Sequence, residues 1–141
     1  MIHKFATAAA VAIILSAGAA QAEIVHFSAK LTGADEVPAN ASQGKGELSA
    51  ELETVEKVLV YRASYSGLSG PATMAHFHGP AAPGGNGPPV VVVKDASSPL
   101  SGTAILTTAQ EADLLAGKWY FNVHTQANGG GEIRGQVKRL N

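Results

Sequence analysis

Residues 118–125 read Lys-Trp-Tyr-Phe-Asn-Val-His-Thr, a run in which apolar and polar side chains alternate. Successive side chains of an extended strand point to opposite faces, so Trp119, Phe121 and Val123 share one face. His124 lies on the opposite, polar face together with the other even-numbered residues. The run therefore predicts a half-buried strand that contributes to the core and presents His124 away from it.

Similar runs recur along the chain and are separated by Gly, Pro, Asn and Ser, a pattern typical of an all-β sandwich or barrel. Strands are predicted over residues 24–31, 47–53, 58–65, 73–78, 90–93, 101–106, 118–125 and 132–137. A short helix is predicted before residue 117, because Thr108 and Glu111 form a capping box and Gly117 ends the apolar pattern. We expect an all-β fold, a single Greek-key β-sandwich of about eight strands with one short helix.

The predicted core is made of apolar side chains at inward-facing strand positions, with one from the helix. These residues are Val25, Phe27, Leu48, Leu52, Leu59, Tyr61, Val91, Ile105, Leu115, Trp119, Phe121, Val123 and Ile133.

Residues 1–22 differ in composition from the rest of the chain. Lys4 supplies a positive start, a small apolar run follows, and Ala20-Gln21-Ala22 forms an A-x-A cleavage signal. These features are typical of a secretory signal peptide, and the Ala-rich run is short for a membrane anchor. We expect residues 23–141 to form the mature domain, periplasmic or secreted, with no membrane attachment after cleavage.

Composition excludes several classes of function. The chain has 10 Lys+Arg against 11 Asp+Glu and no Cys. Without a basic surplus, capture of nucleic acid is not expected. Without cysteine, disulfides, thiolate metal sites and cysteine nucleophiles are excluded.

Three histidines suggest a metal site. His76 and His78 lie two residues apart on a predicted strand, so both side chains point to one face, and His124 lies on the polar face of another strand. Imidazole suits copper or zinc, and the fourth ligand is left open between water, His26 and Glu132. The competing interpretation is that the histidines only hydrogen-bond loops to the sheet.

Five phrases resemble the CHRD domain, a module first described in chordin and widespread in bacterial secreted proteins. They are residues 31–38 (LTGADEVP), 67–71 (GLSGP), 75–80 (AHFHGP), 114–125 (LLAGKWYFNVHT) and 131–136 (GEIRGQ). The resemblance runs from about Val25 to Val137. In chordin-like proteins the module belongs to an extracellular protein that binds growth factors, a context that does not transfer to a free-standing secreted domain. The partner classes left open are a metal ion, a small anion, and an extracellular or periplasmic protein.

A more distant similarity is to copper/zinc superoxide dismutases, which also carry an H-x-H strand in a Greek-key sandwich. It implies that His76, His78 and His124 ligate copper and that Arg134 guides a small anion to it. The zinc-loop ligands and the disulfide of those enzymes are absent, so a dismutase would be copper-only. Three hypotheses stay open: a copper-type metal-binding module, a copper-only dismutase-like enzyme, and a metal-free structural or protein-interaction module.

Overall fold

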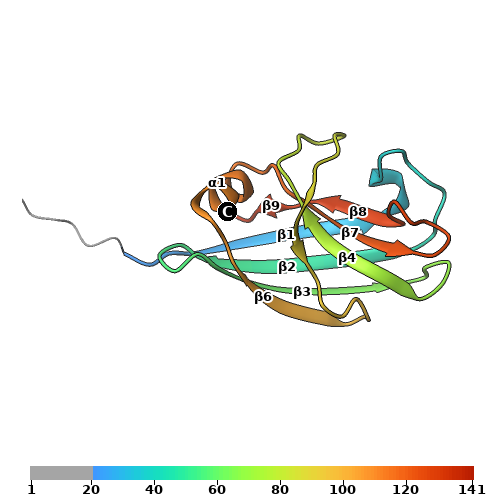
Figure 1. The fold of residues 1–141 in the computed structure, drawn as a ribbon, viewed down its shortest axis with the longest axis horizontal. Helices are drawn as coiled ribbons and strands as arrows, with labels where there is room; N and C mark the ends of the chain where they lie inside the picture. Colours follow the sequence, from blue (N-terminus) through green and yellow to red (C-terminus); the bar gives the residue numbers. More distant parts are fainter. Residues whose placement is uncertain (1–20) are drawn as a thin grey trace, which may run out of the picture.

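The computed structural model describes residues 21–141. Residues 1–20, which hold most of the predicted signal peptide, lie outside the described part. Residues 21–141 form nine strands, one α-helix and one short 3-10 helix (Figure 1). Their bounds are β1 Ile24–Thr32, η1 Gly33–Asp35, β2 Lys45–Glu53, β3 Val58–Ser66, β4 Ala72–His78, β5 Pro89–Val92, β6 Leu100–Ile105, α1 Thr108–Leu115, β7 Tyr120–Thr125, β8 Ile133–Gln136 and β9 Lys138–Arg139. The predicted all-β fold with one short helix is confirmed.

The strands form one antiparallel sheet in the order β5-β4-β7-β8-β1-β2-β3-β6, with β9 also paired to β1. The chain crosses between the two halves of this order at the β3–β4, β5–β6 and β6–β7 connections. Figure 1 shows the half with β4, β7 and β8 lying over the half with β1, β2 and β3. The sandwich is thus one sheet folded over, joined where Thr32 of β1 pairs with Arg134 of β8.

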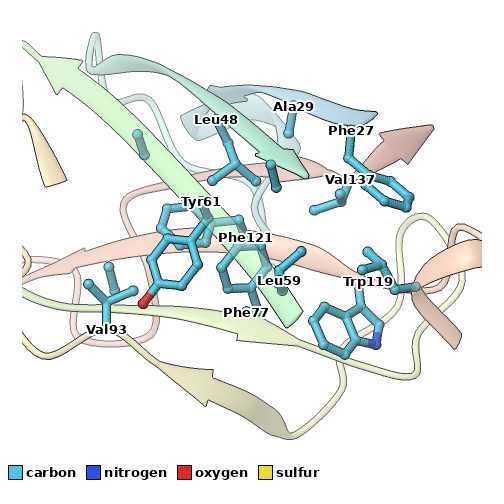
Figure 2. Packing of buried hydrophobic residues seen from close by; sticks show 14 of the residues in the cluster. Phe27, Ala29, Leu48, Leu59, Tyr61, Phe77, Val93, Trp119, Phe121 and Val137 are labelled. Carbon is cyan, nitrogen blue, oxygen red and sulfur yellow. The ribbon is translucent and has the colours of Figure 1, made fainter. Parts of the chain in front are cut away.

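The core fills the space between the two halves and is built by strand alternation. Along β1, residues 25, 27, 29 and 31 are buried, while their neighbours are exposed or half-buried. Aromatic rings from three strands meet at the centre: the Phe77 ring centroid lies 5.1 Å from that of Tyr61 and 4.8 Å from that of Phe121 (Figure 2). Trp119 is also fully buried. Large aromatic side chains bury much apolar area, so this cluster supplies a major part of the hydrophobic stabilisation.

The predicted core is correct except at Ile105, which is 81% exposed; Val91 and Leu115 are partly buried against the core. The phase of β6 explains this error. Gly102 faces inward, where any Cβ would collide with the Tyr61 hydroxyl group. Residues of even number in β6 therefore face the core, Leu106 is buried, and Ile105 points to solvent.

The capping box was predicted one residue too late. Thr107 is the N-cap, its side chain accepts from the Gln110 amide, and the Gln110 side chain accepts from the Thr107 amide. Leu106, just before Thr107, is still buried in the core, and Thr107 is the last residue with an extended backbone before the helix. A cap needs extended backbone, and Thr108 is already helical.

The two ends of residues 23–141 lie side by side. Strand β9 pairs with β1 at Phe27 and Ser28, and the Leu140 amide donates to the His26 carbonyl group at 2.8 Å. An ion pair of 3.0 Å joins Arg139 to Glu23. Within residues 21–141, no helix has the length and hydropathy needed to cross a membrane.

Candidate metal site

The three predicted histidines are brought together by the pairing of β4 with β7. His76 lies opposite Asn122, and His78 lies opposite Tyr120. His124 is two residues from Asn122, so it occupies the diagonal position next to His76 on the same face. Side chains at diagonal positions of an antiparallel pair are within reach of one another when they are long or aromatic.

The ring nitrogens converge. His76 Nδ1 lies 3.2 Å from His124 Nε2. One nitrogen from each of His76, His78 and His124 lies within 4.8 Å of the other two. Two nitrogens bound to one ion at about 2.0–2.1 Å are themselves about 3 Å apart, in tetrahedral or square geometry. The separation of the His76 and His124 nitrogens therefore fits two ligands of one ion.

Backbone carbonyl groups orient two of the rings. His78 Nδ1 lies 2.9 Å from the Gly87 oxygen, and His124 Nδ1 lies 3.0 Å from the Gly129 oxygen. A carbonyl oxygen only accepts, so the neutral His78 ring carries its proton on Nδ1 and keeps a lone pair on Nε2. In His124 both nitrogens face acceptors, because Nε2 also lies beside the Asn122 Oδ1 atom. This arrangement, in which the second nitrogen donates to a carbonyl group, is the one that metal-bound histidines usually show.

One of the other ring nitrogens has no partner among the described residues, and one has two close neighbours. His78 Nε2 is buried and has no hydrogen-bond partner. His124 Nε2 faces the Asn122 Oδ1 atom at 2.9 Å as well as the His76 ring. A buried nitrogen without a partner is costly, and a metal ion between these atoms would remove that cost.

The environment of His76 and His78 favours their neutral form. Burial lowers the pKa of His76, and the nearby His124 and His78 rings act in the same direction. Burial also lowers the pKa of His78, against the opposing effect of its hydrogen bond to Gly87. Metal ions bind the neutral ring, so these shifts favour ligation at neutral pH.

Arg134 and Tyr120 both hydrogen-bond to the loop of residues 79–89, which contacts His78 through Gly87. The Tyr120 ring is stacked on His78, with ring centroids 4.7 Å apart, and the Arg134 guanidinium carbon lies 3.4 Å from the Tyr120 ring centroid. Arg134 donates to the Asn86 side chain at 2.8 Å and to the Gly85 carbonyl group. Arg134 is 2% exposed and is bonded to the loop, so it positions the loop, and its role as an anion guide stays a prediction.

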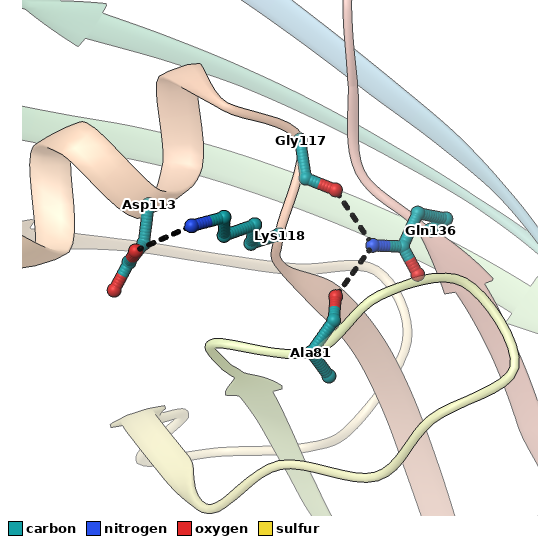
Figure 3. Close-up of polar contacts among 5 residues, drawn as sticks. All are labelled: Ala81, Asp113, Gly117, Lys118 and Gln136. Atoms are coloured by element: carbon teal, nitrogen blue, oxygen red, sulfur yellow. Dashed lines mark hydrogen bonds and ion pairs between the residues drawn. The ribbon is translucent and has the colours of Figure 1, made fainter.

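The start of the same loop is fixed from the other side. The Gln136 side-chain amide donates to the carbonyl groups of Gly117, at 2.8 Å, and of Ala81, at 3.3 Å (Figure 3). The Ala81 amide in turn donates to the Lys118 carbonyl group at 2.8 Å. The loop that presents the Gly87 carbonyl group to His78 is thus tied down at both of its ends.

Glu132 lies outside the histidine group and ties loops together. It is fully buried and accepts hydrogen bonds from Ser42 Oγ at 2.7 Å, from Ser69 N at 2.7 Å and Oγ at 2.6 Å, and from Thr125 Oγ1 at 2.6 Å. Burial by itself would raise the pKa of Glu132, but these hydrogen bonds lower it to about 2. The carboxylate therefore joins three chain segments, one of which follows His124 directly.

His26, the other predicted fourth ligand, faces solvent on β1. Its Nδ1 atom lies 3.6 Å from Glu51, and both side chains are more than half exposed. Neither His26 nor Glu132 belongs to the group of three converging histidines.

Sequence reasoning missed Glu36, a buried acid beside the loop anchor. Glu36 is 6% exposed, and burial raises its pKa to about 7, against the opposing effect of Arg134. Gly131, at a φ of 129°, leaves room for this contact, because a Cβ there would collide with Glu36 and Asn122. The phrase at residues 31–38 was available as a signal, but it says nothing about which distant residues the carboxyl group meets.

A family model for the CHRD domain matches residues 27–137, nearly all of the described chain. No curated protein and no solved structure matches the chain. The similarity to superoxide dismutases therefore still rests on the sequence motifs. The family match covers the strands that carry the three histidines and the loops that orient them, and the chain belongs to the CHRD domain family.

Proposed function

We propose that residues 23–141 form a periplasmic or secreted binding module that holds a copper-type metal ion through His76, His78 and His124. The observation that carries the proposal is the 3.2 Å separation of His76 Nδ1 and His124 Nε2, with a nitrogen of His78 within 4.8 Å of both. The residues fit copper or zinc, because imidazole nitrogen suits both ions. The location outside the cytoplasm rests on the composition of residues 1–22.

Backbone carbonyl groups orient two of the three rings, as the surroundings of metal ligands usually do. The loop of residues 79–89 orients His78, and the turn that carries Gly129 orients His124. Such outer contacts fix ring orientation and raise the basicity of the ligands. A bound ion would be ligated from two adjacent strands, β4 and β7. Substitution of any one histidine would leave only two of the three ligands.

A dismutase-like role needs a cation that an incoming anion can reach. Arg134 is buried beneath residues 85 and 86 and donates to both of them. Its charge is used to hold the loop, so the geometry favours binding over anion steering. In the alternative function, a protein-interaction module, the loops around the histidines would form the interface with the partner protein.

The test is the metal content and the Cu(II) and Zn(II) affinity of purified residues 23–141. The variant for comparison replaces His76, His78 and His124 by Ala, and His26→Ala is the matched control because its ring is exposed on β1. We expect one ion per chain in the wild type and in the His26→Ala variant, and none in the triple variant. Trp119 fluorescence reports whether each protein is folded.

Two outcomes contradict the proposal. If the folded wild type binds neither ion, the site is not a metal site, and a protein-interaction module is the function to pursue. If the triple variant binds as well as the wild type, the ion is held elsewhere.

A further inference from the structure

Met74 lies next to the histidines on the same face of the sheet. It precedes His76 by two residues and His78 by four on β4, so all three side chains point to one side. In the pairing of β4 with β7, Met74 lies directly opposite His124. Directly opposed residues have Cβ atoms about 4.5–5.5 Å apart. Met74 is thus a neighbour of two of the three histidines by register.

Packing does not explain a methionine at this position. Met74 is 46% exposed and lies outside the core cluster. Its side chain is unbranched and has three rotatable bonds, so the thioether can turn toward an ion at the histidines. Met1 and Met74 are the only sulfur-containing residues of the chain. The one thioether of residues 21–141 is therefore at the edge of the candidate site.

A second apolar side chain borders the same place. Val92 of β5 lies opposite His76 and is 64% exposed. Met74 and Val92 are thus two exposed apolar residues at register positions next to His76 or His124. Apolar surroundings favour an ion of lower charge, and a thioether is a soft ligand that selects Cu(I) over Zn(II).

We propose that the Met74 thioether is the fourth ligand of the three-histidine site and makes the site selective for the cuprous ion over zinc. The inference rests on the proposed metal-binding function. It adds a sulfur ligand that the histidine geometry does not include, and it replaces His26, Glu132 and water as the fourth ligand. Three imidazoles alone accept Zn(II) and Cu(II), whereas the added thioether raises the affinity for Cu(I).

The test compares the wild type with the Met74→Leu variant, which keeps the size and apolar character of an exposed side chain. Cu(I) affinity is measured by competition with a colorimetric Cu(I) chelator under anaerobic conditions, and Zn(II) affinity with a zinc chelator. We expect Cu(I) affinity to fall about tenfold or more and Zn(II) affinity to change less than about threefold. X-ray absorption at the copper edge is expected to show one sulfur neighbour in the wild type and none in the variant.

The matched control is the double variant Met74→Leu, Val60→Met. Val60 is 38% exposed on β3, in the other half of the sheet. The double variant restores one thioether but places it away from the histidines, so its Cu(I) affinity is expected to stay as low as that of Met74→Leu. Recovery of the wild-type affinity would show that any exposed thioether suffices and would overturn the assignment.

The outcomes separate this inference from the metal site itself. A wild type that binds Cu(I) and Zn(II) through the histidines, with a Met74→Leu variant of unchanged Cu(I) affinity or an unchanged absorption spectrum, overturns the role of Met74 and leaves the proposed function intact. An equal loss of Zn(II) and Cu(I) affinity in the variant overturns the selectivity. A folded wild type that binds neither ion overturns both proposals.

Discussion

Replacement of Glu132 by Gln is expected to destabilise the fold. The ionised carboxylate accepts hydrogen bonds from Ser42, Ser69 and Thr125, and none of it is exposed. Gln has one acceptor oxygen and an amide group that donates. If that amide replaces Oε1, the buried Ser69 N–H is left without an acceptor; if it replaces Oε2, the Ser69 and Thr125 hydroxyl groups lose their hydrogen bonds to a charged acceptor.

The pKa shift of Glu132 gives the magnitude. The hydrogen bonds lower its pKa from 4.5 to about 2 despite burial. Each unit of pKa corresponds to about 1.4 kcal/mol, so the ionised form contributes about 3 kcal/mol to the free energy of unfolding. Because the folded pKa is the lower one, this contribution is complete above pH 4.5 and is lost as the pH falls toward 2. The difference between wild type and Glu132→Gln is therefore expected to be about 3 kcal/mol at pH 7 and to narrow in that window.

Urea unfolding followed by the fluorescence of Trp119, the only tryptophan, measures this difference at pH 7 and at pH 3. Glu47→Gln is the matched control, because Glu47 is exposed on β2 and its loss should change the free energy of unfolding by less than about 0.5 kcal/mol. A loss below about 1 kcal/mol in Glu132→Gln at pH 7 would refute the reasoning. The reasoning would also be refuted if the free energies of unfolding of wild type and variant fell by the same amount between pH 4.5 and pH 2.

Three further predictions concern the core and the loop. Gly102→Ala is expected to lower the free energy of unfolding by about 1–3 kcal/mol in urea titrations, because the added Cβ collides with Tyr61; an unchanged midpoint would contradict this. Glu36 has a raised pKa of about 7, so its ionisation destabilises the fold as the pH rises from 4.5 through 7. In thermal melts, the Glu36→Gln variant should not lose stability over this pH range, and above pH 7 its free energy of unfolding should exceed that of the wild type by up to about 3 kcal/mol. The same pH dependence of stability in both proteins would contradict this prediction. Arg134→Lys should lower the opening free energy of residues 79–89 by about 1.5–3 kcal/mol in hydrogen exchange, whereas unchanged exchange there would show that other contacts hold the loop.

The sequence predicted the strands well because alternation reports directly which face of a strand is buried. Residues 118–125 show this, since the apolar side chains of Trp119, Phe121 and Val123 are all in the core. The prediction failed at Ile105 because the choice of which face of a strand points to the core also depends on the strand that pairs with it. The constraint there is that Gly102 leaves room for the Tyr61 ring, which lies opposite it in the pairing of β6 with β3.

The candidate site was predictable in part for the same reason. A spacing of two residues places His76 and His78 on one face of any strand. That His124 joins them depends on the pairing of β4 with β7, which local alternation does not specify. Glu36 was missed because its buried position arises from contacts with residues about a hundred positions away.

The neighbouring ends of β1 and β9 make this module easy to rearrange. Because an ion pair joins Glu23 to Arg139, a short peptide could close residues 23 and 141 into a ring without moving a strand. New ends opened between the exposed residues 55 and 56 would then leave the histidines and their loops untouched. The same geometry lets the module sit between two segments of a host protein, entering and leaving at one point. Circularly permuted forms should fold, and a host could carry the three histidines as a self-contained insert.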